Sequence, residues 1–217
     1  YILDLQPKNS FIRWLVAQGH TVFVISWVNP GRELGDKGFE DYLLEGPVAA
    51  LDAIRAITGS AQSNVIGYCL GGTLLAGLLA YLKATGAADQ VASATFLTTM
   101  IDFEEPGDLG VFIDDDQVAS LEKKMKRDGY LDGTDMATTF NMLRANDLIW
   151  SFVINNYLMG DEPLAFDLLY WNSDSTRMPA KMHSEYLRTM YLENRFKKPG
   201  GMVLGGVTID IPSVDTP

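Results

Sequence analysis

The sequence predicts an α/β fold, in which a parallel sheet carries helices on both of its faces. Two nearly unbroken apolar runs, residues 21–27 and 94–101, are typical of strands that are buried on both sides. A third short strand runs into residues 67–72, Gly-Tyr-Cys-Leu-Gly-Gly, where a helix begins. Because helical patterns separate these strands, we expect a parallel sheet whose ligand crevice lies at the carboxyl ends of its strands.

The elements of the first half follow in order along the chain. Asn9 or Ser10 could cap a helix over residues 8–19, which Gly19 would end. A loop rich in proline and glycine then separates the first strand from the second helix. The expected elements after the first helix are strand 21–27, helix 39–58, strand 64–68, helix 72–84 and strand 94–101.

From about residue 102 the pattern becomes helical and rich in aromatic residues. Helices are expected at residues 114–127, 135–143, 147–158 and 181–196. Strand character returns at residues 201–211, where Gly205 and Gly206 predict a small hairpin turn. The expected domains are a core over residues 1–101, a helical cap inserted over residues 102–200, and a return to the core sheet over residues 201–217.

Cys69, the only cysteine of the chain, lies at the apex of the turn between strand and helix. The pattern Gly-x-Cys-x-Gly fits a nucleophile elbow in which sulfur replaces the usual serine oxygen. Gly67 and Gly71 would let strand and helix approach closely. The apex places the thiol at a helix N-terminus, which favours the thiolate, and the backbone N–H of Leu70 would bind an oxyanion. The alternative is a buried, inert cysteine in a strand-to-helix turn.

Composition limits the class of protein. A chain of 217 residues with 47% hydrophobic residues suits one domain with a sizeable core. Its net charge of −11 argues against nucleic acid and against an anionic membrane surface as partners. A single cysteine forms no internal disulfide, which favours a reducing, intracellular setting. No apolar run reaches the roughly 18 residues of a membrane span, and no signal peptide is visible.

A cysteine nucleophile needs a base, and neither histidine of the chain is well placed to be one. His20 precedes the strand 21–27, so it lies on the order of 20 Å from the carboxyl edge of the sheet. His183 follows the cysteine in chain order but falls in an expected helix of the cap, where we expect a surface or packed residue. Asp102 directly follows the last strand, where an acid could stand, although capping or loop hydrogen bonding is the simpler role.

Several segments carry a resemblance to a known family. They are residues 1–7, 24–30 (Val-Ile-Ser-Trp-Val-Asn-Pro), 67–72, 144–150 (Arg-Ala-Asn-Asp-Leu-Ile-Trp), 166–176, 181–196 and 205–217. In this order they closely resemble polyhydroxyalkanoate synthases, which polymerise 3-hydroxyacyl-CoA. The motif at residues 67–72 by itself equally resembles dienelactone hydrolases, which are compact and lack the cap. The cap segments therefore favour the synthase.

The resemblance implies an α/β-hydrolase core with an inserted cap, working as a homodimer. Cys69 matches the family's nucleophile, which carries the growing polyester as a thioester. No metal or other cofactor is implied, because the CoA thioester is the substrate. The implied partners are (R)-3-hydroxyacyl-CoA, the growing polyester and the surface of a polyester granule in the cytoplasm. Tyr170 and Trp171 are candidate walls of a dry pocket.

The family's catalytic aspartate and histidine belong to loops beyond Pro217, and Asp102 and His183 do not match them. The chain also begins without methionine, so we expect it to be an interior fragment that is inactive by itself. An acidic chain that binds CoA needs a local basic patch. Lys123, Lys124, Lys126 and Arg127 are a candidate, although a solvated helix face is the simpler interpretation.

Two other functions stay open at this point. One is a cysteine hydrolase of the dienelactone type, which would cleave a small ester or lactone with water. The other is a non-catalytic pseudo-hydrolase that binds granules or partners a complete subunit. Released acid measured against polymer would separate the two enzyme functions.

Overall fold

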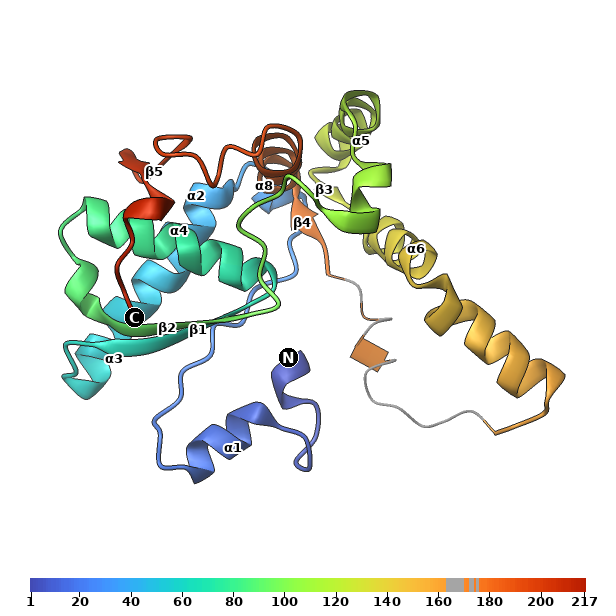
Figure 1. Cartoon of the computed structure of the whole chain (residues 1–217), viewed down its shortest axis with the longest axis horizontal. Coiled ribbons are helices and arrows are strands. Elements are labelled where there is room, and N and C mark those ends of the chain that lie inside the picture. Colours follow the sequence, from blue (N-terminus) through green and yellow to red (C-terminus); the bar gives the residue numbers. More distant parts are fainter. Residues whose placement is uncertain (163–169, 172–173, 175) are drawn as a thin grey trace. The chain divides into compact units, whose positions relative to one another are not determined.

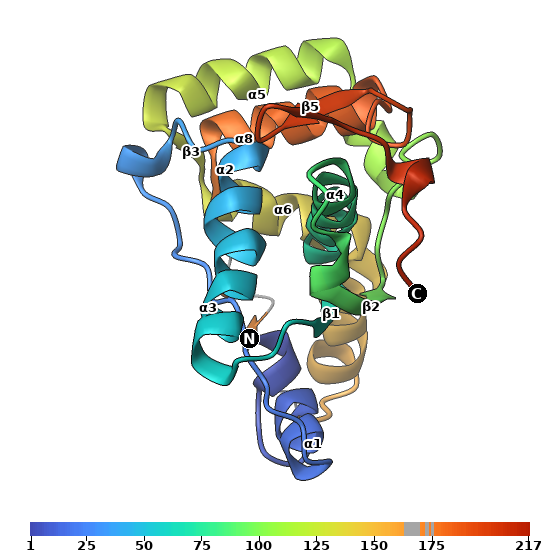
Figure 2. The same ribbon diagram turned by 90° about the vertical axis from the view of Figure 1, so that its left-hand side faces the viewer.

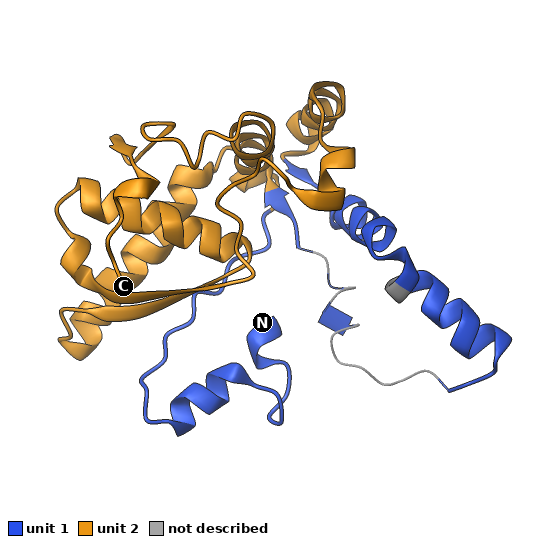
Figure 3. Cartoon of the chain, viewed as in Figure 1, with its two compact units in different colours: residues 1–30, 130–178 blue, residues 31–129, 179–217 orange. Residues whose placement is uncertain are grey.

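The computed structural model of the chain describes residues 1–162, 170–171, 174 and 176–217. Within the resembling segment 166–176, residues 166–169, 172, 173 and 175 lie outside the described residues. The chain divides into two compact units (Figure 3), the first made of residues 1–30 and 130–178 and the second of residues 31–129 and 179–217. This division is based on contacts, and the cap over residues 102–200 stays a prediction.

A pair of parallel strands in the second unit carries the cysteine motif. Strand β1 (Ser63–Tyr68) pairs in parallel with β2 (Val91–Leu97), as the sequence predicts. The predicted strand 94–101 begins and ends earlier, because Thr98 has a φ of 47°, a conformation that no strand residue adopts. Helix α4 (Leu70–Ala84) joins the two strands and lies across them (Figure 1).

Helix α4 is buried on nearly every side. Ten of its fifteen residues are buried, among them Leu74, Leu75 and Leu78. A helix that is apolar all round belongs in a core, which is where α4 lies. In the part of the chain that the structure describes, no helix has both the length and the apolar character to cross a membrane.

The predicted helix 39–58 forms with one irregularity. It begins as α2 (Phe39–Leu43), widens into the π-helix η3 (Leu44–Val48) and continues as α3 (Ala49–Thr58). The widened turn contains Pro47, which has no N–H to donate to the preceding turn. Gly59 ends α3 with a φ of 72°, a common left-handed helix terminus.

Two further helices of the second unit run side by side (Figure 2). Helix α5 (Asp115–Asp128) begins at Asp114, whose carboxylate accepts the N–H of Gln117 at 2.8 Å, and ends at Gly129. The second helix is α8 (Ala180–Glu185), which continues as the π-helix η8 (Tyr186–Leu192). The basic side chains at positions 123, 124, 126 and 127 are exposed on α5, which fits a solvated helix face.

The predicted hairpin at residues 201–211 is confirmed. Strand β5 (Met202–Leu204) pairs antiparallel with β6 (Val207–Ile209). Gly205 and Gly206 join them with φ angles of 57° and 76°, which glycine adopts without steric cost. Beyond the hairpin, the N–H of Ala94 in β2 donates to the carbonyl of Pro217 at 2.8 Å.

The first unit contains the amino-terminal helix and the helices of residues 130–158. Helix α1 (Phe11–Ala17) has Ser10 as its cap, whose Oγ accepts the N–H of Arg13 at 2.8 Å. Helix α6 (Gly133–Leu143) and two π-helices, η6 (Asn146–Trp150) and η7 (Val153–Leu158), fall where helices are predicted. The short elements among the described residues are η1 (Ile2–Asp4), η2 (Arg32–Leu34), η4 (Ala88–Gln90), η5 (Gly107–Phe112), η9 (Ile211–Ser213), β3 (Tyr130–Leu131) and β4 (Met178–Pro179).

The prediction of a strand at residues 21–27 is wrong. The segment belongs to no sheet of the described chain, and Phe23, Val24 and Ile25 expose 42%, 62% and 41% of their surfaces. A strand forms only where a neighbouring strand accepts its backbone hydrogen bonds. An apolar run predicts burial, but it does not supply that neighbour.

Candidate active site

Cys69 is the single residue between β1 and α4, and its backbone is strained. Its φ of 54° and ψ of −124° lie where non-glycine residues are rare, at a cost of about 1–3 kcal/mol. The N–H of Cys69 donates to the carbonyl of Leu97 at 2.9 Å, and its carbonyl accepts the N–H of Gly72 at 2.9 Å. These two bonds hold the turn in place. Cys69 is exposed, which rules out the buried, inert cysteine.

Two glycines allow strand and helix to meet at this turn, and one of them is not the predicted one. A Cβ on Gly67 would stand 2.6 Å from the Cα of Gly72. A Cβ on Gly72 would stand 1.8 Å from Oγ1 of Thr99. A Cβ on Gly71 would meet nothing within 4 Å, because this residue is exposed on the first turn of α4. The role expected of Gly71 therefore belongs to Gly72.

The first turn of α4 also holds the loop that follows β2. Oγ1 of Thr73, which is only 1% exposed, donates to the carbonyl of Met100 at 2.7 Å. Thr99 packs on Gly72, as the short distance to a Cβ there shows. The segment after β2 is thereby fixed against the start of the helix.

The start of α4 offers a backbone donor beside the cysteine. Leu70 is the first residue of the helix, and the first N–H groups of a helix have no acceptor within it. No residue that the structure describes accepts the N–H of Leu70. An exposed sulfur at the positive end of a helix can attack the carbon of an acyl group. The unused N–H beside it can then donate a hydrogen bond to the oxyanion that forms.

Three aromatic rings of the second unit pack together, and none of them was selected from the sequence as a site residue. Phe103, Tyr186 and Tyr191 stack edge to face, with ring centroids 4.8–5.9 Å apart. Burial raises the pKa of both tyrosines, and the negative charge of Cys69 acts in the same direction on each. The two tyrosines of this aromatic cluster therefore lie within electrostatic range of the sulfur.

Asp102 ties two segments of this site together. Its carboxylate accepts hydrogen bonds from Nζ of Lys197 and Nδ2 of Asn194, both at 2.8 Å, and from the N–H of Glu104 at 3.1 Å. These bonds, with that of Lys197 the strongest, lower the pKa of Asp102 to about 2. Asn194 also accepts the N–H of Phe103 at 3.0 Å. The structure therefore supports the loop role of Asp102 and gives no sign of an acid role.

His183 is packed, as expected. It is 4% exposed, its Nδ1 has no partner in the described chain, and burial lowers its pKa to about 4. His20 lies exposed in the first unit. Tyr170, which is 72% exposed, and the half-buried Trp171 also belong to the first unit, and their role as pocket walls stays a prediction.

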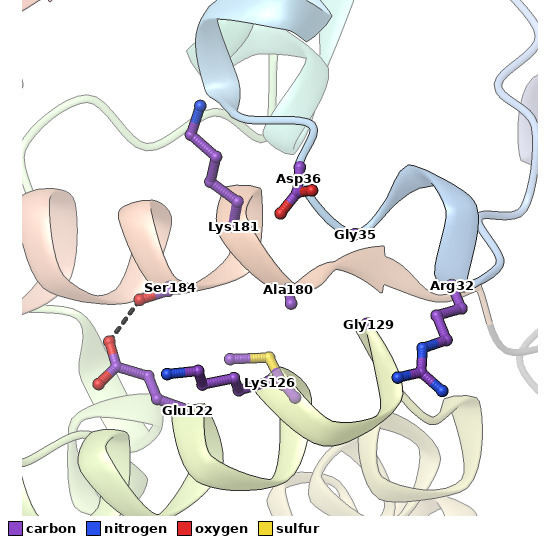
Figure 4. Close-up of a pocket in the computed structure, with 10 residues that line it drawn as sticks. Arg32, Gly35, Asp36, Glu122, Lys126, Gly129, Ala180, Lys181 and Ser184 are labelled. Carbon is purple, nitrogen blue, oxygen red and sulfur yellow. Dashed lines mark hydrogen bonds between the residues drawn. The ribbon is translucent and has the colours of Figure 1, made fainter.

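A cavity of about 420 Å³ opens between the loop around η2, helix α5 and helix α8 (Figure 4). Glu122 on its wall is already paired, since it accepts a hydrogen bond from Ser184 and two bonds of 2.6 Å from Arg188. Neither Cys69 nor the aromatic cluster lines the cavity. Its charged residues are of both signs: Arg32, Lys126, Lys181, Asp36 and Glu122.

The elbow and its sheet agree with the comparisons with known proteins. Residues 3–201 match the alpha/beta hydrolase fold family, and the chain belongs to this family. The predicted fold class is therefore confirmed. In this fold the nucleophile stands at the sharp turn between a strand and a helix, and Cys69 occupies such a turn.

The resemblance to polyhydroxyalkanoate synthases is confirmed as well. Over its whole length the chain is 56% identical to a poly(3-hydroxyalkanoate) polymerase of Methylorubrum extorquens. It is also 56% identical to the poly(3-hydroxyalkanoate) polymerase subunit PhaC of Rhizobium meliloti, and 42% identical to that of Cupriavidus necator. It spans 36%, 35% and 38% of these proteins, which is little more than a third of their length.

The glycine contacts predict a contrast in stability. Gly67→Ala and Gly72→Ala should each cost about 1–3 kcal/mol, because the new methyl group meets neighbouring atoms at 2.6 Å and 1.8 Å. Gly71→Ala should be neutral or stabilise by up to about 1 kcal/mol, since it meets open space in a helix. Thermal unfolding of the full-length protein measures this, and an equal loss in all three variants would contradict the assigned contacts.

His183 predicts a loss of stability in acid. The unfolded chain binds a proton at this residue below a pH of about 6.5, and the folded chain only below about 4. Stability from this residue is therefore complete above pH 6.5 and is lost as the pH falls toward 4. Between pH 7.5 and 4.5 the wild type should lose about 2–3 kcal/mol more than His183→Leu.

Urea unfolding at the two pH values measures this difference. His20→Leu is the matched control, because His20 is exposed and its replacement should leave the wild-type difference intact. A His183→Leu variant with the same pH dependence as the wild type would show that His183 is not held neutral by burial.

Proposed function

We propose that the chain is part of a polyhydroxyalkanoate synthase, an acyltransferase that polymerises (R)-3-hydroxyacyl-CoA and releases CoA. The observation that carries this proposal is the strained, exposed Cys69 at the elbow of a chain 56% identical to named polymerases. The elbow supplies the chemistry, and the relatives supply the class of substrate. No cofactor enters the proposal, because the thioester itself is the activated group.

The first proposed step is an exchange of thioesters. The thiolate of Cys69 attacks the acyl carbon of the CoA thioester, and the carbonyl oxygen becomes an oxyanion that accepts the N–H of Leu70. The C–S bond to CoA then breaks, CoA leaves as a thiolate, and the acyl group is bound to Cys69. Because one thioester replaces another, the step is nearly balanced in energy, which suits sulfur better than oxygen.

The second proposed step lengthens the polymer. The 3-hydroxyl of another acyl group loses its proton to a base and attacks the acyl carbon held on Cys69, which forms an ester and frees the thiolate. The resemblance assigns this base to the histidine loop of the family, which matches no residue of this chain. His183 is not proposed for it, because the residue is 4% exposed and carries a strongly lowered pKa.

Water must be kept from the acyl-enzyme, since hydrolysis would end the polymer. We propose that residues 102–200 act as the cap that does this, with Tyr170 and Trp171 as candidate walls. A homodimer, the surface of a polyester granule and a cytoplasmic location complete the proposal, and all three rest on the resemblance. The exposed lysines of α5 are a weak candidate for contacts to the phosphates of CoA.

The role of Cys69 is tested in the full-length protein with 3-hydroxybutyryl-CoA. Cys69→Ala should reduce CoA release by at least about 1,000-fold, because the covalent step has no other nucleophile. Asp102→Asn is the matched control and should keep activity within about threefold, since Asp102 binds Lys197 and Asn194 rather than substrate. CoA release is followed with a thiol reagent, and polymer by turbidity.

The products of the same assay separate the competing functions. Polymer with stoichiometric CoA supports the synthase. Free 3-hydroxybutyrate with CoA but no polymer would indicate a hydrolase. A folded wild-type protein that releases no CoA would indicate a non-catalytic relative.

A further inference from the structure

We propose that Thr98 contacts the substrate and donates a hydrogen bond from Oγ1 to an oxygen of the acyl group held on Cys69. The inference rests on the proposed role of Cys69 as the nucleophile. It adds a side chain from the neighbouring strand to a site that the sequence defines only by the elbow.

Thr98 is the neighbour of Cys69 at the carboxyl edge of the sheet. The pairing of β1 with β2 ends at Tyr68 and Leu97. Cys69 and Thr98 are the residues that follow on the two strands. The peptide group that joins Leu97 to Thr98 accepts the N–H of Cys69 on its oxygen, at 2.9 Å. Because paired strands lie about 4.8 Å apart, a side chain at position 98 is within reach of a group bound to the sulfur.

Both residues have a backbone conformation that is rare for any residue other than glycine. The φ angles are 54° at Cys69 and 47° at Thr98. A positive φ is a genuine outlier for a β-branched residue such as threonine, and it persists only where neighbouring contacts impose it. Outliers of this kind are concentrated at active sites, and these two face one another across the ends of paired strands.

Contacts on both sides of Thr98 impose its conformation. Oγ1 of Thr99 donates to the carbonyl of Leu97 at 3.2 Å. The carbonyl of Met100 accepts Oγ1 of Thr73 at 2.7 Å, which binds the loop to the first turn of α4. The chain before and after position 98 is therefore held against the elbow, and Thr98 is the exposed bend between the two attachments.

The hydroxyl of Thr98 is available to a ligand. The residue is exposed, and within the described chain its Oγ1 has no hydrogen-bond partner, whereas the hydroxyls of Thr73 and Thr99 are both used. An acyl group on Cys69 brings a carbonyl oxygen to this edge. A 3-hydroxyacyl group brings a second oxygen, three bonds from the acyl carbon. A hydroxyl donor on the adjacent strand can reach either oxygen.

A simpler role for Thr98 is a bend that only ends β2. In that case its hydroxyl is dispensable, and glycine, which adopts a positive φ without steric cost, should serve at least as well. Under the proposed role the hydroxyl is required. Valine, which keeps the shape of the side chain, and glycine, which relieves the backbone, should then both lower activity. Serine keeps the hydroxyl and should restore most of it.

The test follows single-turnover CoA release in the full-length protein with 3-hydroxybutyryl-CoA. Thr98→Val and Thr98→Gly should each slow release by about tenfold, which corresponds to the loss of one hydrogen bond. Thr98→Ser should stay within about threefold of the wild type. Thr95→Val is the matched control, because Thr95 is exposed on β2 three residues before Thr98, and it should keep the wild-type rate.

Butyryl-CoA, which lacks the 3-hydroxyl, identifies the acceptor. An equal loss with both substrates assigns the hydrogen bond to the carbonyl oxygen, and a loss confined to 3-hydroxybutyryl-CoA assigns it to the 3-hydroxyl. A folded Thr98→Gly variant with the wild-type rate, or a Thr98→Ser variant as slow as Thr98→Val, would overturn the inference and leave the synthase function intact. A wild type that releases no CoA would reject both.

Discussion

The close approach of β1 and α4 is the constraint on which the rest of the site depends. A side chain at Gly67 would stand 2.6 Å from the Cα of Gly72, so the helix can begin one residue after the strand only because both are glycines. Cys69 is then the whole turn, and its φ of 54° is the consequence. The sulfur and the N–H of Leu70 lie together at the positive end of α4 for the same reason. The strain at Cys69 is thus imposed by backbone packing, and the chemistry uses it.

Features set by neighbours in the sequence could be predicted, and features set by distant partners could not. The elbow, the cap at Ser10 and the turn at Gly205 and Gly206 each depend on a few consecutive residues, and all are present in the structure. The run at residues 21–27 has the composition of a strand, but no neighbour in the described chain pairs with it. Hydrophobicity predicts that a segment is buried, whereas pairing is a property of two segments at once.

The aromatic cluster shows why a site is harder to predict than a fold. Tyr186 and Tyr191 are five residues apart, and in an α-helix they would point about 140° away from each other. They meet because residues Tyr186–Leu192 form a π-helix, whose hydrogen bonds span five residues. Phe103 comes from a distant part of the chain. Its N–H donates a hydrogen bond to Asn194, which lies 91 residues further along the sequence. Neither a period of 3.6 residues nor any spacing in the sequence indicates these contacts, so only Cys69 could be selected beforehand.

Charge is the remaining problem for a thiolate in this protein. A chain with a net charge of −11 opposes one more negative charge, although salt limits that opposition to about 8–10 Å. The first carboxylate of the loop after β2, Asp102, is neutralised by Lys197, whose Nζ lies 2.8 Å from Oδ2 of Asp102. What acts on the sulfur is therefore local, above all the positive end of α4. Local dipoles and hydrogen-bond donors can favour a thiolate without a nearby cation, which is how an acidic chain can carry an anionic nucleophile.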